Sequence, residues 1–176
     1  GTPMIPDIYQ DANGGDYGEG MWQRMYQLAV GLSAPTIVEI GTRTGNSLRI
    51  WAAACQGNSG QVYSVDCSML PQATDGTPWR IPERCALIVN SSHLVQWALP
   101  IDLLYIDGDH TPEGLRRDLE CWWPRVRARG HVLIHDVTNQ GHYVDLIPVV
   151  NQLARANSIA FEVWANQCGM AHLVKP

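Results

Sequence analysis

The stretch TIVEIGTRTG, residues 36–45, joins a short apolar run to a turn with two glycines, and a helical pattern begins just after it. Glycines in such a turn let a ligand lie against bare backbone amides. Twenty-one residues past Gly45, a second apolar run, QVYSVD, ends in Asp66. A carboxylate can accept hydrogen bonds from both hydroxyls of a ribose. A glycine turn after one strand and an acid ending the next therefore predict a pocket for a nucleoside-containing ligand.

The glycine spacing narrows the kind of ligand. A dinucleotide fingerprint GxGxxG would need glycine at positions 43 and 46, where the chain has Arg43 and Asn46. No Gly-Lys-Ser/Thr follows, so the turn is not a phosphate-binding P-loop. The pattern favours a nucleoside without a pyrophosphate. Two plainer interpretations stay open: a simple tight turn, and an Asp66 that is only a solvated acid at a strand end.

Composition bounds the class of protein. The chain has 176 residues, 45% hydrophobic and 16% charged, which predicts a globular protein with one domain over residues 19–176, preceded by a flexible arm over 1–18. The net charge of −5 without a basic block argues against a nucleic-acid partner. No apolar run approaches the ~18 residues of a membrane span. Five cysteines without CxxC spacing indicate reduced thiols and a cytoplasmic protein.

Apolar runs alternate with helical patterns along the chain. The expected strands are 36–40, 61–65, 86–89, 102–106, 131–134, 160–164 and 170–174, and the expected helices are 19–32, 46–54, 93–98, 112–130 and 144–156. Residues 67–84 carry three prolines and are expected to form an irregular loop. This rhythm predicts an α/β fold: a Rossmann-like, doubly wound, mostly parallel seven-stranded sheet with a C-terminal antiparallel hairpin.

Polar residues follow the predicted strands where each one ends. Asp107 and His110 follow the fourth strand, and His135 and Asp136 close the fifth. Carboxyl ends of parallel strands share one edge of the sheet, and neighbouring strands lie ~4.8 Å apart, so Asp107 and Asp136 are placed to share one cation. The alternative is that both acids cap helices and bind water. His110 is a candidate general base.

Three stretches resemble class I S-adenosylmethionine-dependent methyltransferases. VEIGTRTGNS resembles their first motif and VYSVD their second. IDLLYIDGDHTPEGLRRDLECWWPRVRARGHVLIHDV, residues 101–137, resembles the small-molecule O-methyltransferase branch that includes catechol and caffeoyl-coenzyme A O-methyltransferases, and cephalosporin-hydroxylase-like proteins share it. The resemblance covers residues 18–175.

The resemblance implies a role for each matching position. S-adenosylmethionine would be held at its amino-acid end by Glu39, Gly41, Thr42 and the turn through Gly45, at its ribose by Asp66, and near its adenine by Ser91, a position where relatives often carry an acid. The implied metal ligands are Asp107, His135 and Asp136, for Mg²⁺ or Mn²⁺, with histidine where relatives usually have an acid. His110 stands where the catechol enzymes carry a catalytic lysine, with Asp107 beside it in the catalytic set.

The implied reaction is direct methyl transfer to a hydroxyl of a small-molecule acceptor, with neither nucleic acid nor membrane as partner, and relatives of this branch often form homodimers. Two other functions remain open. A nicotinamide-dependent oxidoreductase would use a similar sheet, although the missing second glycine of the turn counts against it. A non-catalytic module would bind S-adenosylmethionine without turnover.

Overall fold

A computed structural model describes residues 20–43, 45–68, 80–138, 144–165 and 168–176. Its strands are β1 (Thr36–Ile40), β2 (Gln61–Asp66), β3 (Cys85–Val89), β4 (Ile101–Ile106), β5 (Val126–His135), β6 (Glu162–Trp164) and β7 (Met170–Val174). Its α-helices are α2 (Met21–Val30), α3 (Asn46–Asn58), α4 (Pro112–Trp122) and α5 (Ile147–Ala156), with 3₁₀ turns η2 (Ser92–Leu94) and η3 (Trp123–Arg125).

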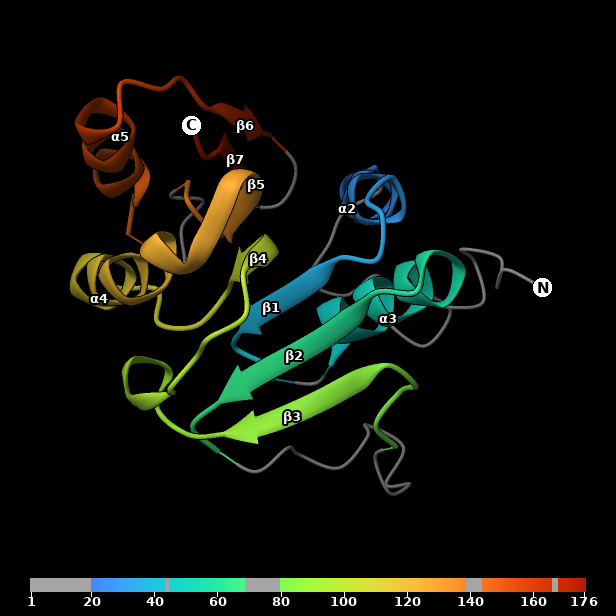
Figure 1. Cartoon of the computed structure of the whole chain (residues 1–176). Coiled ribbons are helices and arrows are strands. Elements are labelled where there is room, and N and C mark those ends of the chain that lie inside the picture. Colours follow the sequence, from blue (N-terminus) through green and yellow to red (C-terminus); the bar gives the residue numbers. More distant parts are fainter. Residues whose placement is uncertain (1–19, 44, 69–79, 139–143, 166–167) are drawn as a thin grey trace.

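The strands form one sheet in the order β3-β2-β1-β4-β5-β7-β6 (Figure 1). Strands β1 to β5 run parallel, whereas β7 is antiparallel to both β5 and β6. The predicted mostly parallel sheet with an antiparallel C-terminal hairpin is therefore confirmed. The chain runs outward from β1 to β3 and then crosses back to β4, so the strand order reverses between β1 and β4. Such a switch point opens a ligand crevice at the carboxyl ends of the strands.

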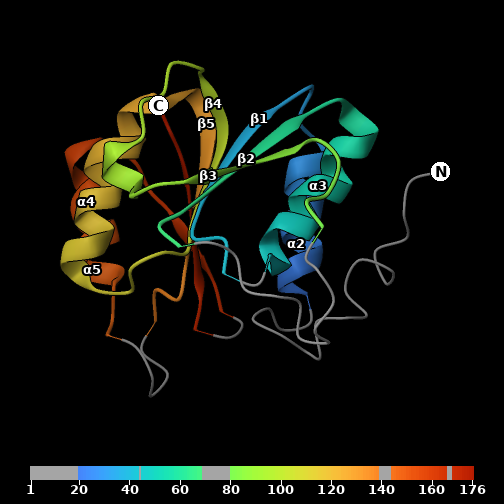
Figure 2. The same ribbon diagram turned by 90° about the horizontal axis from the view of Figure 1, so that it is seen from below.

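Helices cover both faces of the sheet, with α2 and α3 on one side and α4 and α5 on the other (Figure 2). Each face has its own buried core. Leu103 and Tyr105 of β4 pack toward the α2/α3 side, and Leu104 and Ile106 pack toward the α4/α5 side. This alternation follows from the two-residue period of a strand. Because both faces are buried, the parallel strands read as continuous apolar runs, which is why they were recognisable in the sequence.

Helix α4 begins as predicted and ends earlier than predicted. The Thr111 hydroxyl accepts a hydrogen bond from the Gly114 amide at 3.0 Å, and Pro112 occupies the first turn. The helix was expected to run to Gly130, but it stops at Trp122. Pro124 has no N–H for the helical ladder, and β5 then starts at Val126.

The helix predicted over 93–98 is wrong, because only the short turn η2 forms there. The Trp122 indole donates to the Ser92 carbonyl at 3.1 Å, and the Arg125 guanidinium donates to the Val95 carbonyl at 3.0 Å. These two carbonyls thus accept hydrogen bonds from side chains that lie 30 residues further along the chain, instead of from helical backbone amides. Helix α3 runs four residues beyond its predicted end at 54, and α5 starts at Ile147 rather than 144.

The predicted arm over 1–18 and most of the predicted loop, residues 69–79, lie outside the described residues. None of the helices in the described part of the chain combines the length and the apolar character needed to cross a bilayer.

Candidate active site

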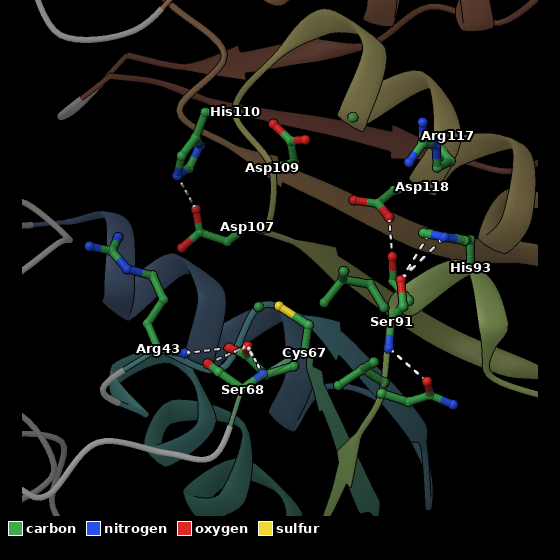
Figure 3. A pocket seen from close by; sticks show the side chains of 18 residues that line it. Arg43, Cys67, Ser68, Ser91, His93, Asp107, Asp109, His110, Arg117 and Asp118 are labelled. Atoms are coloured by element: carbon green, nitrogen blue, oxygen red, sulfur yellow. Dashed lines mark hydrogen bonds and ion pairs between the residues drawn. The ribbon is translucent and has the colours of Figure 1, made fainter.

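A cavity of about 860 Å³ opens at the carboxyl ends of β1 to β4, beside the first turns of α4 (Figure 3). Its volume lies within the ~300–1,000 Å³ typical of small-molecule sites. Five of the residues predicted to form a site line it, namely Gly41, Asp66, Ser91, Asp107 and His110. The others, Glu39, Thr42, Gly45, His135 and Asp136, are not among the lining residues.

The glycine turn lets the ends of β1 and β4 touch. Gly41 has φ +96°, and a Cβ added there would lie only 2.3 Å from the carbonyl oxygen of Asp107. Any side chain at this position would force the two strand ends apart. Beyond it, the buried Thr42 hydroxyl shares a hydrogen bond with the Ser64 hydroxyl at 2.5 Å, and Gly45, with φ +80°, begins α3. The turn therefore has a structural role in addition to any contact with a ligand.

Glu39 lies beneath the turn and is 0% exposed. Its two carboxylate oxygens accept hydrogen bonds from the Ser47 hydroxyl at 2.6 Å and the Ser64 hydroxyl at 2.5 Å. Burial raises the pKa of Glu39 to about 7, although these hydrogen bonds pull it down, and the nearby Asp107 charge adds to the rise. The structure thus places Glu39 as a support under the turn that joins β1, β2 and α3.

The Asp66 carboxylate binds the same turn from the end of β2. One oxygen accepts from the backbone amides of Thr42 at 2.9 Å and Arg43 at 3.1 Å, and the other accepts from the amide and hydroxyl of Ser68. Burial alone would raise the pKa of Asp66, but the hydrogen bonds outweigh it and lower the pKa below its usual value. Asp66 therefore lines the cavity as an ionised carboxylate that accepts hydrogen bonds from the turn and stabilises its conformation.

At one end of the cavity, two acids and an imidazole form a cluster. Ligand atoms of Asp107, His110 and Asp136 all lie within 4.8 Å of one another. His110 Nδ1 is 3.5 Å from Asp136 Oδ2, and His110 Nε2 is 4.0 Å from Asp107 Oδ1. Figure 3 shows the His110 ring directed at the Asp107 carboxylate. The side chain of His110 is 23% exposed, so it can be reached from the cavity.

His135 is enclosed behind this cluster and is 3% exposed. Its Nδ1 lies 3.4 Å from Asp107 Oδ1 and 3.4 Å from Asp136 Oδ2. The residues that the structure brings together as a potential metal site therefore include His110 where the sequence suggested His135. His135 therefore contacts both acids but is not among the residues that line the cavity.

The two carboxylates differ in their surroundings. Burial raises the pKa of Asp136, the nearby His135 lowers it, and the negative charge of Asp107 raises it again. Asp136 also adopts φ +58°, with its amide bonded to the Gly169 carbonyl at 3.0 Å. Asp107 Oδ2 accepts from the Tyr105 hydroxyl at 3.2 Å, whereas its buried Oδ1 has no hydrogen-bond partner among the described residues. A buried carboxylate oxygen in that state is suited to a cation.

The opposite end of the cavity is formed by the segment after β3 and by α4. The predicted Ser91 lines it, and its hydroxyl lies 3.1 Å from His93 Nδ1. Asp118 was not singled out from the sequence, yet it lines the cavity and is 4% exposed. Burial raises the pKa of Asp118, while a hydrogen bond from Ser92 opposes the rise. Its signal was present in the sequence: an acid at a helical position where the pattern calls for an apolar residue.

Arg43 is a second lining residue that sequence reasoning passed over. It occupies the glycine turn with φ +47°, and its side chain extends toward the Asp107 end of the cavity (Figure 3). Its positive charge lowers the pKa of Asp136, though less than burial raises it. In the sequence this residue only showed that the turn lacks the second glycine of a dinucleotide fingerprint.

Several solved structures of similar architecture are methyltransferases. An S-adenosylmethionine-dependent O-methyltransferase from Thermotoga maritima matches with a TM-score of 0.73 at 15% identity, over 98% of this chain and 71% of that one. TomG from Streptomyces achromogenes, solved with S-adenosylmethionine, matches with a TM-score of 0.63 at 15% identity, over 99% of this chain and 92% of that one. MycE of the mycinamycin pathway, solved with Mg and S-adenosylhomocysteine, matches with a TM-score of 0.69 at 16% identity, over 99% of this chain and 55% of that one.

At these identities the likeness establishes the fold. The family follows from the sequence itself, because a family model described as a methyltransferase domain matches residues 38–137, more than half of the chain. The matched segment begins in β1 and ends just past Asp136, so it contains the glycine turn, Asp66 and the acid–imidazole cluster. The chain belongs to this methyltransferase family.

Proposed function

We propose that this protein transfers a methyl group from S-adenosylmethionine to a hydroxyl of a small molecule. One observation carries the proposal: a single cavity connects Asp66 and the glycine turn to the cluster of Asp107 and His110 (Figure 3). A methyltransferase must hold a nucleoside and a reacting hydroxyl side by side, and this cavity offers groups suited to both. The methyltransferase family and the bound molecules named for MycE and TomG support this pairing.

Different residues of the cavity bind different parts of S-adenosylmethionine. Asp66 accepts hydrogen bonds from the ribose hydroxyls, exchanging them for some of those that it now takes from Thr42 and Arg43. The methionyl end lies against the turn at Gly41, where no side chain intervenes. Glu39 acts from beneath by holding the turn. The sulfonium would then lie toward Asp107, with its methyl group facing His110.

The reaction follows from this placement. The acceptor hydroxyl gives its proton to His110, because imidazole is a general base suited to neutral pH. The oxygen attacks the methyl carbon in line, and as the new C–O bond forms the C–S bond breaks, leaving its electron pair on a neutral thioether sulfur. Asp136 stabilises the protonated imidazole from 3.5 Å. Most of the acceleration comes from holding the two reacting groups in line.

A divalent cation fits the two carboxylates. Asp107 and Asp136 would hold Mg²⁺ or Mn²⁺ through oxygen, the ligand that both ions favour. The buried Oδ1 of Asp107, which accepts no hydrogen bond within the described residues, would be one of these ligands. Such an ion supplies positive charge that makes a bound hydroxyl more acidic. We assign His110 as the base, since it is the most exposed of the three residues.

Calorimetry with S-adenosylhomocysteine tests the proposal. The purified protein should bind it with micromolar affinity, and Asp66→Ala should weaken binding about tenfold or more through lost charge-assisted hydrogen bonds. NAD should not bind. Incubation of S-adenosylmethionine with a panel of phenols, catechols and sugars should give an O-methyl ether by mass spectrometry. Absence of any affinity for S-adenosylhomocysteine, or equal binding of the Asp66→Ala variant, would refute this function.

The cellular setting belongs to the same proposal. All five cysteines are free thiols, including the exposed Cys67 beside Asp66. Exposed thiols persist in a reducing compartment, so we place the protein in the cytoplasm. Fractionation of cells that produce the native protein would test this.

A further inference from the structure

Asp118 is a buried acid that faces the cavity from α4 (Figure 3). The residue is 4% exposed, and one carboxylate oxygen, Oδ1, accepts a hydrogen bond from the Ser92 hydroxyl at 2.5 Å. The other oxygen, Oδ2, faces the cavity (Figure 3). A carboxylate oxygen at the edge of a cavity can accept a hydrogen bond from a ligand's amino group.

The space in front of this oxygen is kept open by Gly108. A Cβ on Gly108 would stand 3.4 Å from the Ile40 side chain and 3.5 Å from Asp118 Oδ2. Gly108 is not among the glycines with positive φ, so its backbone does not require glycine. The missing side chain therefore leaves a gap with an apolar wall at Ile40 and an acceptor at its edge. This part of the cavity therefore offers a ligand an apolar surface and a hydrogen-bond acceptor side by side.

The direction of the bound nucleoside follows from the proposed function, on which this inference rests. The reacting end lies at Asp107 and His110, and the ribose lies at Asp66. The base must then extend to the remaining end of the cavity, where Figure 3 shows Ser91 and Asp118 facing the same space. The Ser91 hydroxyl is already turned to His93 at 3.1 Å. Asp118 is the acid at this end of the cavity.

We propose that Asp118 Oδ2 accepts a hydrogen bond from the exocyclic amino group of the adenine, and so selects adenosyl over other purine ligands. The acid comes from α4, after the fourth strand, instead of from the position of Ser91 after the third. Hypoxanthine carries a carbonyl oxygen in place of the amino group and a proton on N1, where adenine has an acceptor. Against a carboxylate, the carbonyl oxygen replaces attraction with repulsion.

The experiment compares two nucleosides that differ only along this edge of the base. Calorimetry should show that wild-type protein binds S-adenosylhomocysteine about 10- to 100-fold more tightly than S-inosylhomocysteine. Asp118→Asn keeps an oxygen for the Ser92 hydroxyl and nearly the same shape, but its amide can also donate to a carbonyl. In this variant the ratio of the two affinities should fall toward one, because S-adenosylhomocysteine binds more weakly and S-inosylhomocysteine binds more tightly.

A matched control is Glu113→Gln, which removes one negative charge from an exposed position of the same helix. This variant should keep the wild-type preference. A purely structural role for Asp118 would lower both affinities together and leave their ratio unchanged, which would overturn the inference. So would a wild-type protein that binds both nucleosides equally, a result that stands even if Asp118→Asn fails to fold. Failure of the wild type to bind S-adenosylhomocysteine at all would instead overturn the proposed function, and this inference with it.

Discussion

The carbonyl oxygen of Asp107 lies 2.3 Å from the point at which a side chain on Gly41 would begin. The first residue after β1 and the first after β4 are thus in backbone contact, at the point where the strand order reverses. This contact brings the glycine turn and the acid–imidazole cluster into one cavity, although the two lie more than sixty residues apart in the sequence.

Gly41→Ala should destabilise the protein by about 2–4 kcal/mol, because the added methyl group overlaps the Asp107 backbone and φ +96° strains any L-residue. Urea unfolding measures the loss. Gly57→Ala is the control: this exposed glycine is inside α3 with nothing within 4 Å of an added Cβ, so the change should stabilise by about 0.5 kcal/mol. Equal effects of the two substitutions would contradict the backbone contact.

Asp66→Asn should alter how stability depends on acidity. The folded-state pKa of Asp66 is lowered, so its hydrogen bonds contribute stability above the unfolded pKa of about 4 and lose it as pH falls through the lower folded value. Urea unfolding of both proteins between pH 3 and 6 should show the wild-type advantage shrinking on acidification. The other carboxyl groups cancel in that difference. An advantage that is constant with pH would show that the Asp66 charge does not hold the turn.

Glu39→Gln should have the opposite pH signature. The pKa of Glu39 is raised from 4.5 to about 7, so the folded state retains a proton that the unfolded chain releases. The wild type therefore loses stability relative to the variant as pH rises from about 4.5 to 7, by up to about 3 kcal/mol, and the difference is flat above that. Chemical denaturation at a series of pH values checks the sign. A wild type that instead gains stability relative to the variant as pH rises would show that the pKa of Glu39 is not raised in the folded protein.

Manganese ions should raise the melting temperature, since an ion at a concentration of 100 times its dissociation constant stabilises the folded state by about 2.7 kcal/mol. Asp136→Asn should abolish this shift, and a chelator should reverse it in the wild type. His110→Ala should keep the shift but lose methyl transfer to the acceptor found in the screen. Loss of the shift in His110→Ala would make this residue a metal ligand and contradict its assignment as the base. Exposed Glu113→Gln serves as the unaffected control.

The sequence predicted the structure best where a residue acts on the backbone immediately around it. Thr111 and Pro112 predicted the start of α4 correctly because capping and proline geometry are local. The buried strands were recognisable because both faces of the sheet are covered. The end of α4 was missed by overlooking Pro124, a local signal that was present in the chain.

Other features depend on partners distant in the sequence. Residues 93–98 do not form a helix, and there the carbonyls of Ser92 and Val95 accept hydrogen bonds from Trp122 and Arg125. Similarly, the sequence placed two acids and two histidines at one edge but could not say which imidazole faces the cavity. Only the packing of β5 against β4 and β7 encloses His135 and leaves His110 accessible.

In the proposed function Asp66 binds both the turn and the ribose, and this double use would have a consequence for turnover. When a nucleoside product departs, the amides of Thr42 and Arg43 can return to the vacated oxygen. Release then exchanges one set of donors for another and never leaves a bare anion inside the protein. Product release would therefore return the site to the arrangement that the structure shows.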